Sequence, residues 1–198
     1  MPETLKDVLT VHLTMPMWLR SKQAGANLLL QLLKHTTNGW KVWRQIKTGE
    51  PVTRLDLRGG PTIYARPKED NVYRLFWEIM VERSYTTRDF YWPMPDHTIV
   101  DIGANIGVFA LECQRIAPGV RIHAVEPSPG TFAQLQQNLL YNRLDASITP
   151  YRLAVSDHHG SPYLKPGAET SAHQELISSG NGDPIPCVTL DKLFTRAH

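Results

Sequence analysis

The 198-residue chain has only two cysteines, Cys113 and Cys187, which excludes a disulfide-stabilised framework. Both lie in apolar segments, so we expect buried free thiols in a reducing compartment and a cytoplasmic location. No apolar run approaches the roughly 20 residues that a membrane span needs. The longest one, LLLQLL at 28–33, is far too short. The N-terminus, MPETLKDVLT, has acids where a secretory signal carries lysines, so we expect no targeting segment.

The net charge is small, +2, but it is unevenly distributed. Residues 1–60 carry nine Lys or Arg and four Asp or Glu, whereas the rest of the chain carries twelve and fifteen. The basic part also holds Trp18, Trp40 and Trp43. This pattern favours either a peripheral binder of an anionic surface or, more simply, a helical extension with solvated lysines. We expect no nucleic-acid partner.

Three segments follow from the order of the patterns: a helical extension at 1–50, a hairpin and helix that lead in at 51–95, and an α/β unit at 96–198. The extension is expected to break near Pro16 and at Asn38-Gly39. Two β-like runs within 52–66 flank Gly59-Gly60-Pro61, which is typical of a hairpin. Asp70 is expected to cap the next helix, whose apolar stripe has helical spacing: Val72, Leu75, Phe76, Ile79 and Met80.

From Thr98 onward, strand-like and helix-like segments alternate. TIVDIG predicts a strand, ANIGVFALECQRIAPG a helix and VRIHAVEP a second strand. Ser128 is expected to cap the next helix, with Pro129 at its first position, and YRLAVS at 151–156 predicts a third strand. Strand and helix at this spacing are typical of parallel βαβ units, so the predicted fold class is α/β.

The first strand ends in DIGANIG, where Gly103 and Gly107 allow the backbone to approach a ligand. The middle glycine of G-x-G-x-x-G is missing, which disfavours a pyrophosphate and therefore a dehydrogenase. Acids end three successive strands: Asp101 for an ammonium group, Glu126 for ribose hydroxyls and Asp157 for an adenine amino group. This set predicts S-adenosylmethionine (S-adenosyl-L-methionine) as the cofactor.

Four segments, TIVDIGANIGVFAL, VEPSPGTFAQLQQNLLYN, LAVSDHHG and VTLDKL, resemble the FkbM family of S-adenosylmethionine-dependent methyltransferases. The lead-in IYARPKEDNVYRLFWEIMVERSY is also similar, with Arg66, Asp70 and Tyr85 at familiar places, so the resemblance covers about 55 to 193. It implies a Rossmann-like class I methyltransferase fold. It also implies O-methylation of a hydroxyl on a sugar, polysaccharide or secondary metabolite, with a small-molecule or glycan acceptor. By position, the implied cofactor contacts are Asp101, Gly103, Asn105, Gly107, Glu126, Pro127, Ser128, Ser156 and Asp157.

In that family further strands follow the VTLDKL segment, whereas this chain ends at FTRAH. We therefore expect only the 3-2-1 half of the parallel sheet, with TIVDIG as an unpaired edge that promotes self-association and with little activity. A cofactor-binding or scaffold protein without turnover stays open beside the enzyme, as does the anionic-surface binder.

No residue is assigned as the catalytic base. His158 and His159 are candidates, but adjacent histidines in a turn are usually solvated. Together with His173 they have no spacing that fixes a metal site, so no metal is expected.

Overall fold

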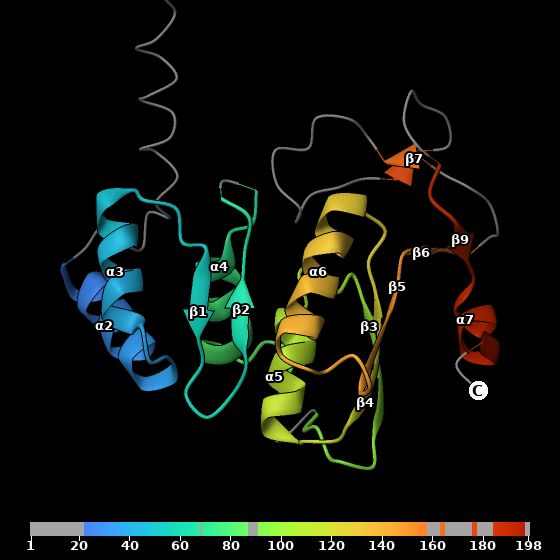
Figure 1. Ribbon diagram of the computed structural model, residues 1–198, viewed down its shortest axis with the longest axis horizontal. Helices are drawn as coiled ribbons and strands as arrows, with labels where there is room; N and C mark the ends of the chain where they lie inside the picture. The colour runs from blue at the N-terminus through green and yellow to red at the C-terminus, as the bar shows by residue number, and fades with distance from the viewer. Residues whose placement is uncertain are drawn as a thin grey trace, which may run out of the picture.

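The computed structural model describes residues 22–67, 69–86, 91–157, 163–164, 176–177 and 184–196. These residues form a helical pair, a hairpin with a helix, and a parallel sheet with helices, side by side in chain order (Figure 1). One core of buried apolar side chains runs through all three groups, from Leu28 in the first to Ile148 in the sheet. None of the helices within the described ranges is long and apolar enough to cross a membrane.

The extension consists of α2 (Lys22–His35) and α3 (Gly39–Thr48). They separate at Asn38-Gly39 as predicted, and Gly39 lies so close to α2 that a Cβ there would sit 2.7 Å from the carbonyl carbon of Leu32. Trp43 donates its ring N–H to the Gly25 carbonyl at 3.1 Å, which ties the two helices together. The predicted break at Pro16 lies outside the described residues.

The lead-in begins with the predicted hairpin, β1 (Arg54–Asp56) antiparallel to β2 (Thr62–Tyr64). A short helix, α4 (Val72–Phe76), continues into a wider π-helical turn, η2 (Trp77–Val81). The prediction that Asp70 caps α4 is wrong. Asn71 is the N-cap and accepts the backbone N–H of Arg74, whereas the Asp70 carboxylate accepts hydrogen bonds from Arg66 and cannot serve the helix.

The main sheet is parallel, in the order β3 (Thr98–Ile102), β4 (Arg121–Val125) and β5 (Ile148–Tyr151). The predicted α/β class and 3-2-1 order are confirmed, and β3 is the end strand of the described sheet. The third strand was predicted at 151–156, too late along the chain, whereas β5 already begins at Ile148 and includes Pro150. Among the described strands β5 pairs with β4 alone, and proline is tolerated on such an outer strand.

Residues 154–155, which were predicted to belong to that third strand, form a separate strand, β6 (Ala154–Val155). It pairs in parallel with β9 (Cys187–Val188), and α7 (Leu190–Arg196) follows. A second small pair is β7 (Tyr163–Leu164) antiparallel to β8 (Leu176–Ile177). Cys113 and Cys187 are both buried and neither forms a disulfide, in agreement with the sequence.

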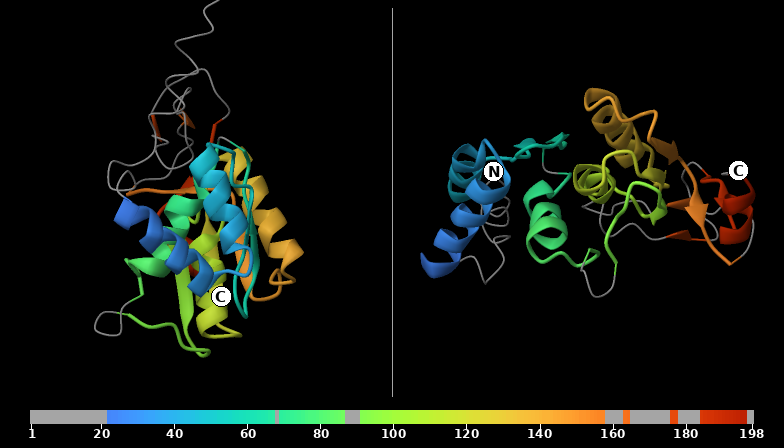
Figure 2. Two further views of the ribbon diagram at one scale, coloured as in Figure 1. Left: turned by 90° about the vertical axis from the view of Figure 1, so that its left-hand side faces the viewer. Right: turned by 90° about the horizontal axis from the view of Figure 1, so that it is seen from below.

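The helices α5 (Val108–Ile116) and α6 (Pro129–Tyr141) cover one face of the sheet, between it and the lead-in (Figures 1 and 2). Segment β6–β9–α7 lies toward the other face, where Leu153, Val188 and Leu193 are buried with Val125. Ser128 is the N-cap residue of α6 as predicted, but its side chain makes no capping bond. Its hydroxyl instead accepts the Thr131 hydroxyl at 3.2 Å.

Candidate functional site

The loop from β3 to α5 has an unusual backbone, with three residues in the left-handed region. These are Gly103 (φ +79°), Asn105 (φ +51°) and Gly107 (φ +89°). The backbone N–H groups of Gly103 and Ala104 both donate to the Val125 carbonyl at 2.9 Å, which holds the loop against the end of β4. A Cβ on Gly107 would lie 2.6 Å from Leu135 Cδ1, so a side chain is excluded there by packing as well as by conformation.

Glu126 is the buried acid that follows β4. Its Oε2 accepts the Asn105 backbone N–H at 3.0 Å and its Oε1 accepts the Ser128 backbone N–H at 2.9 Å. Burial raises the pKa of Glu126 above its ordinary value, although these two N–H groups and the charge of Arg66 act in the opposite direction. Each oxygen keeps a second lone pair, which can accept a hydroxyl of a ligand.

Asp101, near the end of β3, is the least satisfied acid of the site. Its Oδ2 is buried, and no hydrogen bond reaches it from the part of the chain that the structure describes. Burial, together with the charge of Glu126, raises the pKa of Asp101 to about 7. A buried carboxylate without a partner is costly, so the site favours a ligand that brings a positive charge or hydrogen-bond donors.

A cavity of about 650 Å³ opens in front of these two acids. This volume falls within the range of about 300 to 1,000 Å³ that is usual for small-molecule sites. One wall comes from the strand ends and α5, and the other from α4, η2 and the turn after them. The lining residues are Arg74, Leu75, Glu78, Ile79, Tyr85, Val100, Asp101, Ile102, Gly103, Ala104, Asn105, Val108, Phe109, Glu126 and Pro127.

Five of the nine predicted contacts line this cavity: Asp101, Gly103, Asn105, Glu126 and Pro127. Gly107 and Ser128 are not among the lining residues: Gly107 begins α5, and Ser128 donates its backbone N–H to Glu126.

Ser156 and Asp157 lie after β6 and do not line the cavity; the Ser156 hydroxyl donates to Asp157 Oδ1 at 3.0 Å. Their assigned roles stay predictions. His158, His159 and His173 lie outside the described residues.

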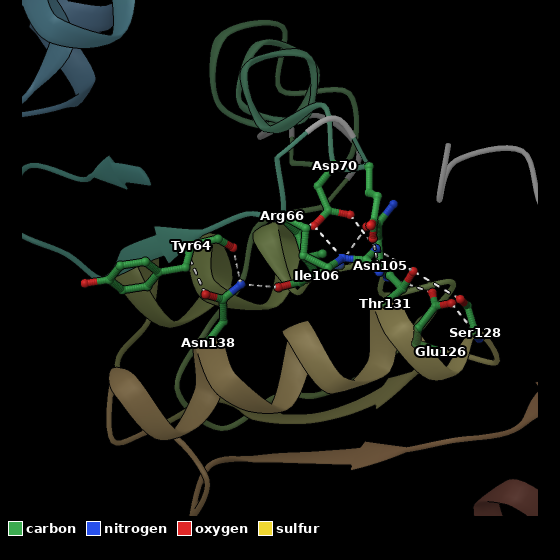
Figure 3. Close-up of polar contacts among 10 residues, drawn as sticks. Tyr64, Arg66, Asp70, Asn105, Ile106, Glu126, Ser128, Thr131 and Asn138 are labelled. Carbon is green, nitrogen blue, oxygen red and sulfur yellow. Dashed lines mark hydrogen bonds and ion pairs between the residues drawn. The ribbon is translucent and has the colours of Figure 1, made fainter. Parts of the chain in front are cut away.

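A polar network links the lead-in to Glu126 (Figure 3). Arg66 donates to both carboxylate oxygens of the buried Asp70, at 2.7 and 3.0 Å, and to the Thr131 hydroxyl at 3.2 Å. Thr131 donates in turn to Ser128, whose backbone N–H holds Glu126. The lead-in is therefore fixed to the start of α6 directly behind the ligand-facing acid.

Two asparagines, Asn138 of α6 and Asn142 at the C-cap of α6, fix the other end of the lead-in. Asn138, fully buried, accepts the Tyr64 backbone N–H at 2.8 Å and donates to the Tyr64 carbonyl at 3.0 Å (Figure 3). It also donates to the Ile106 carbonyl of the glycine loop at 2.8 Å. Asn142 pairs in the same way with Thr62, at 2.8 and 2.7 Å. Each side-chain amide thus accepts a backbone N–H of β2 and donates to a backbone carbonyl of β2, the same pair of hydrogen bonds that a neighbouring strand would make.

Sequence reasoning gave no role to Asn138, Asn142 or Thr131. One signal was available: asparagine is a poor residue for a helix interior, yet two occur four positions apart on one face of LQQNLLYN. Such a pair indicates a tertiary role for both side chains. The partner strand, however, is more than seventy residues away and no local pattern identifies it.

The tryptophans of the basic segment differ in their surroundings. Trp40 is exposed and stacks on Trp43 at 5.1 Å between ring centroids, whereas Trp43 is partly buried and bonded to α2. Trp18 lies outside the described residues. Binding to an anionic surface stays a prediction.

Comparison with known proteins gives one family. The sequence model of the methyltransferase FkbM domain matches residues 101–198. Among curated proteins, the chain is similar to the 31-O-demethyl-FK506 methyltransferase FkbM of Streptomyces tacrolimicus, with 36% identity over 109 residues, 55% of this chain and 40% of that protein. It is also similar to Methyltransferase 1 of Beauveria bassiana, with 36% identity over 90 residues, 44% of this chain and 34% of that protein. The chain therefore spans about two fifths or less of the length of these relatives.

Among solved structures, one similar chain is a methyltransferase FkbM from Methylobacillus flagellatus. The TM-score is 0.34 at 12% identity, over 80% of this chain and 39% of that one.

Proposed function

We propose that the chain binds S-adenosylmethionine and methylates a hydroxyl oxygen, because residues 101–198 match the sequence model of the methyltransferase FkbM domain. The proposed acceptor is a sugar, a polysaccharide or a secondary metabolite. The O-demethyl substrate in the name of the Streptomyces relative supports an oxygen acceptor. The observation that carries the proposal is the cavity of about 650 Å³ lined by the buried Glu126 and by Asp101, whose buried Oδ2 accepts no hydrogen bond from the residues that the structure describes.

The residues present fit this cofactor, which supplies an electrophilic methyl group and its own leaving group. Asp101 offers a buried carboxylate for the ammonium group, and Glu126 offers lone pairs for ribose hydroxyls. Gly103 faces open space on the side where a Cβ would point, so the backbone can approach a ligand closely. Much of the rate in such a transfer comes from aligning the two reactants, and the fixed loop serves that purpose.

We expect Glu126→Ala to weaken the binding of S-adenosylmethionine by about 2 to 4 kcal/mol, through the loss of two charge-assisted hydrogen bonds. Isothermal titration calorimetry measures this change, with Glu50→Ala, which removes an exposed acid of the extension, as the control. NAD should bind weakly at best. An affinity that stays the same in Glu126→Ala would contradict the ribose assignment.

Turnover is tested separately from binding. A chain that binds S-adenosylmethionine but releases no S-adenosylhomocysteine with hydroxylated acceptors would be a binding or scaffold protein without turnover.

We also propose self-association through β3, whose outer edge pairs with no described strand. A strand edge with unpaired N–H and C=O groups favours pairing with another chain. We expect size-exclusion chromatography with light scattering to give a mass above 22.4 kDa that rises with protein concentration. A monomer at every concentration would refute this proposal.

A further inference from the structure

The cavity has a second wall that the proposed cofactor contacts do not use. Three polar side chains of the lead-in line it: Arg74, Glu78 and Tyr85. Asp101 and Glu126 line the same cavity from the strand ends. A cavity of about 650 Å³ that presents acids at the strand ends and further polar groups from the lead-in can hold two reactants.

Glu78 and Tyr85 act as a pair. The Tyr85 hydroxyl donates to Glu78 Oε1 at 3.0 Å, and Glu78 Oε2 has no hydrogen-bond partner in the part of the chain that the structure describes. Burial and the neighbouring carboxylate of Glu78 raise the pKa of Tyr85, so the hydroxyl stays a donor. One oxygen of Glu78 is thus held in place and the other remains able to accept a proton.

The backbone that presents this pair is irregular. Glu78 lies in the π-helical turn η2, and such turns occur frequently at functional sites. Arg83, five residues later, has φ +55°, a left-handed conformation that is costly for a residue with a side chain. Next to it, the Ser84 backbone N–H donates to the Glu78 carbonyl at 3.1 Å, which turns the chain back and brings Tyr85 over Glu78.

The pair is also fixed relative to the glycine loop. The ring of Tyr85 packs edge-on against Phe109 at 5.5 Å between centroids. Phe109 belongs to the first turn of α5, directly after the loop that carries Gly103 and Asn105. The position of Glu78 is therefore coupled to the position of the cofactor-facing backbone.

We propose that Glu78, positioned by Tyr85, accepts the proton of the acceptor hydroxyl; this inference rests on the proposed function. The acceptor oxygen bonds to the methyl carbon while the carbon–sulfur bond breaks. The electron pair of the broken carbon–sulfur bond stays on sulfur, which gives S-adenosylhomocysteine. The proton of the acceptor hydroxyl passes to the Glu78 carboxylate. Proton transfer of this kind contributes about 10²- to 10⁴-fold to a rate.

The test uses Glu78→Gln, in which the amide oxygen still accepts the Tyr85 hydroxyl but takes no proton. We expect kcat for methyl transfer to fall about 100-fold or more, while the calorimetric Kd for S-adenosylmethionine changes less than about twofold, since the cofactor contacts lie on the other wall. The probes are methyl glucoside and 2-butanol, with S-adenosylhomocysteine as the measured product.

Three further variants separate chemistry from structure. Glu78→Asp keeps a carboxylate and should recover part of the lost kcat. Tyr85→Phe removes the positioning hydrogen bond and should lower kcat about tenfold with an unchanged Kd for S-adenosylmethionine. Glu82→Gln, an exposed acid of the same segment that does not line the cavity, should behave as the unaltered chain.

Failures are distinguishable. If the unaltered chain does not bind S-adenosylmethionine, the proposed function fails. If it binds the cofactor but methylates neither probe, the proposed methyl transfer fails, and the assignment of Glu78 fails with it. If Glu78→Gln keeps full kcat, only the assignment of Glu78 is overturned. A loss of kcat accompanied by an equal loss of cofactor affinity would also overturn it, since Glu78 would then be part of the cofactor site or of the fold.

Discussion

Asp101→Asn is expected to weaken S-adenosylmethionine binding by about 100-fold or more while making the free protein more stable. Removing one partner of a buried ion pair costs about 3 to 5 kcal/mol, and the Asp101 carboxylate is the group that we assign to the ammonium of the cofactor. In the free protein Oδ2 of this carboxylate is buried and accepts no hydrogen bond from the part of the chain that the structure describes. A substitution that weakens ligand binding but stabilises the fold is typical of a charged residue that is retained for function.

The stability gain follows from the raised pKa. The pKa of Asp101 is about 7 in the folded protein against an ordinary 3.8. A carboxyl whose folded pKa is raised destabilises the fold progressively as pH rises from about 4 to 7. Well above pH 7 the full cost, about 4 kcal/mol, is present, and Asp101→Asn removes most of it. Thermal unfolding at pH 8 measures the gain.

The same pKa predicts how binding depends on pH in the unaltered chain. Between pH 5.5 and 7, affinity for S-adenosylmethionine should rise about tenfold as Asp101 loses its proton. This pH dependence of the affinity should largely disappear in Asp101→Asn. Any pH dependence that remains is attributed to Glu126, whose pKa is also raised by burial.

The control is Asp96→Asn, which changes an exposed acid just before β3. It should alter neither the affinity for S-adenosylmethionine nor the melting temperature. Unchanged affinity in Asp101→Asn, or a lower melting temperature, would show that this carboxylate has a structural partner instead.

Asn138→Ala is expected to destabilise the fold by about 3 to 5 kcal/mol. The side chain is fully buried, and its loss leaves the N–H and C=O of Tyr64 and the carbonyl of Ile106 without these partners. The affinity for S-adenosylmethionine should fall as well, because Ile106 follows the loop residue Asn105. Urea denaturation followed by circular dichroism measures the change in the free energy of unfolding.

Gln137→Ala provides the matched control. Gln137 is the neighbouring residue of the same helix and is exposed, so its loss should change stability by less than about 0.5 kcal/mol. Equal effects of the two substitutions would mean that Asn138 does not hold the hairpin, and that Asn142, Arg66 and the apolar contacts attach the lead-in without it.

The parts of this molecule that sequence could predict are those set by local patterns. The turn from TIVDIG into α5, the start of α6 at Pro129 and the hairpin around Gly59-Gly60 depend on neighbouring residues, and all were located. The capping of α4 was misassigned because Asp70 and Asn71 are adjacent and both are good caps. Only the guanidinium of Arg66, folded back onto Asp70, decides between them.

The candidate site was half predictable for the same reason. Asp101, Gly103 and Glu126 lie in the βαβ unit itself, where strand ends identify them. Glu78 and Tyr85 lie on a segment that precedes this unit and reach the cavity only through tertiary packing. A glutamate in a helical stretch is usually a solvated surface residue, and nothing in its neighbourhood along the chain distinguishes Glu78 from Glu82.

The bonding of Asn138 and Asn142 to β2 bears on the order in which the chain folds. A two-stranded hairpin is only marginally stable by itself. Here β2 is hydrogen-bonded, beside β1, to Asn138 and Asn142, which lie 74 to 80 residues further along the chain. Contacts of such long range form late, after the intervening loop has closed. The hairpin and α6 should therefore belong to one cooperative unit, protected together from hydrogen exchange. Opening that unit would release the Ile106 carbonyl at the same moment, so the glycine loop would lose its support whenever the hairpin frays.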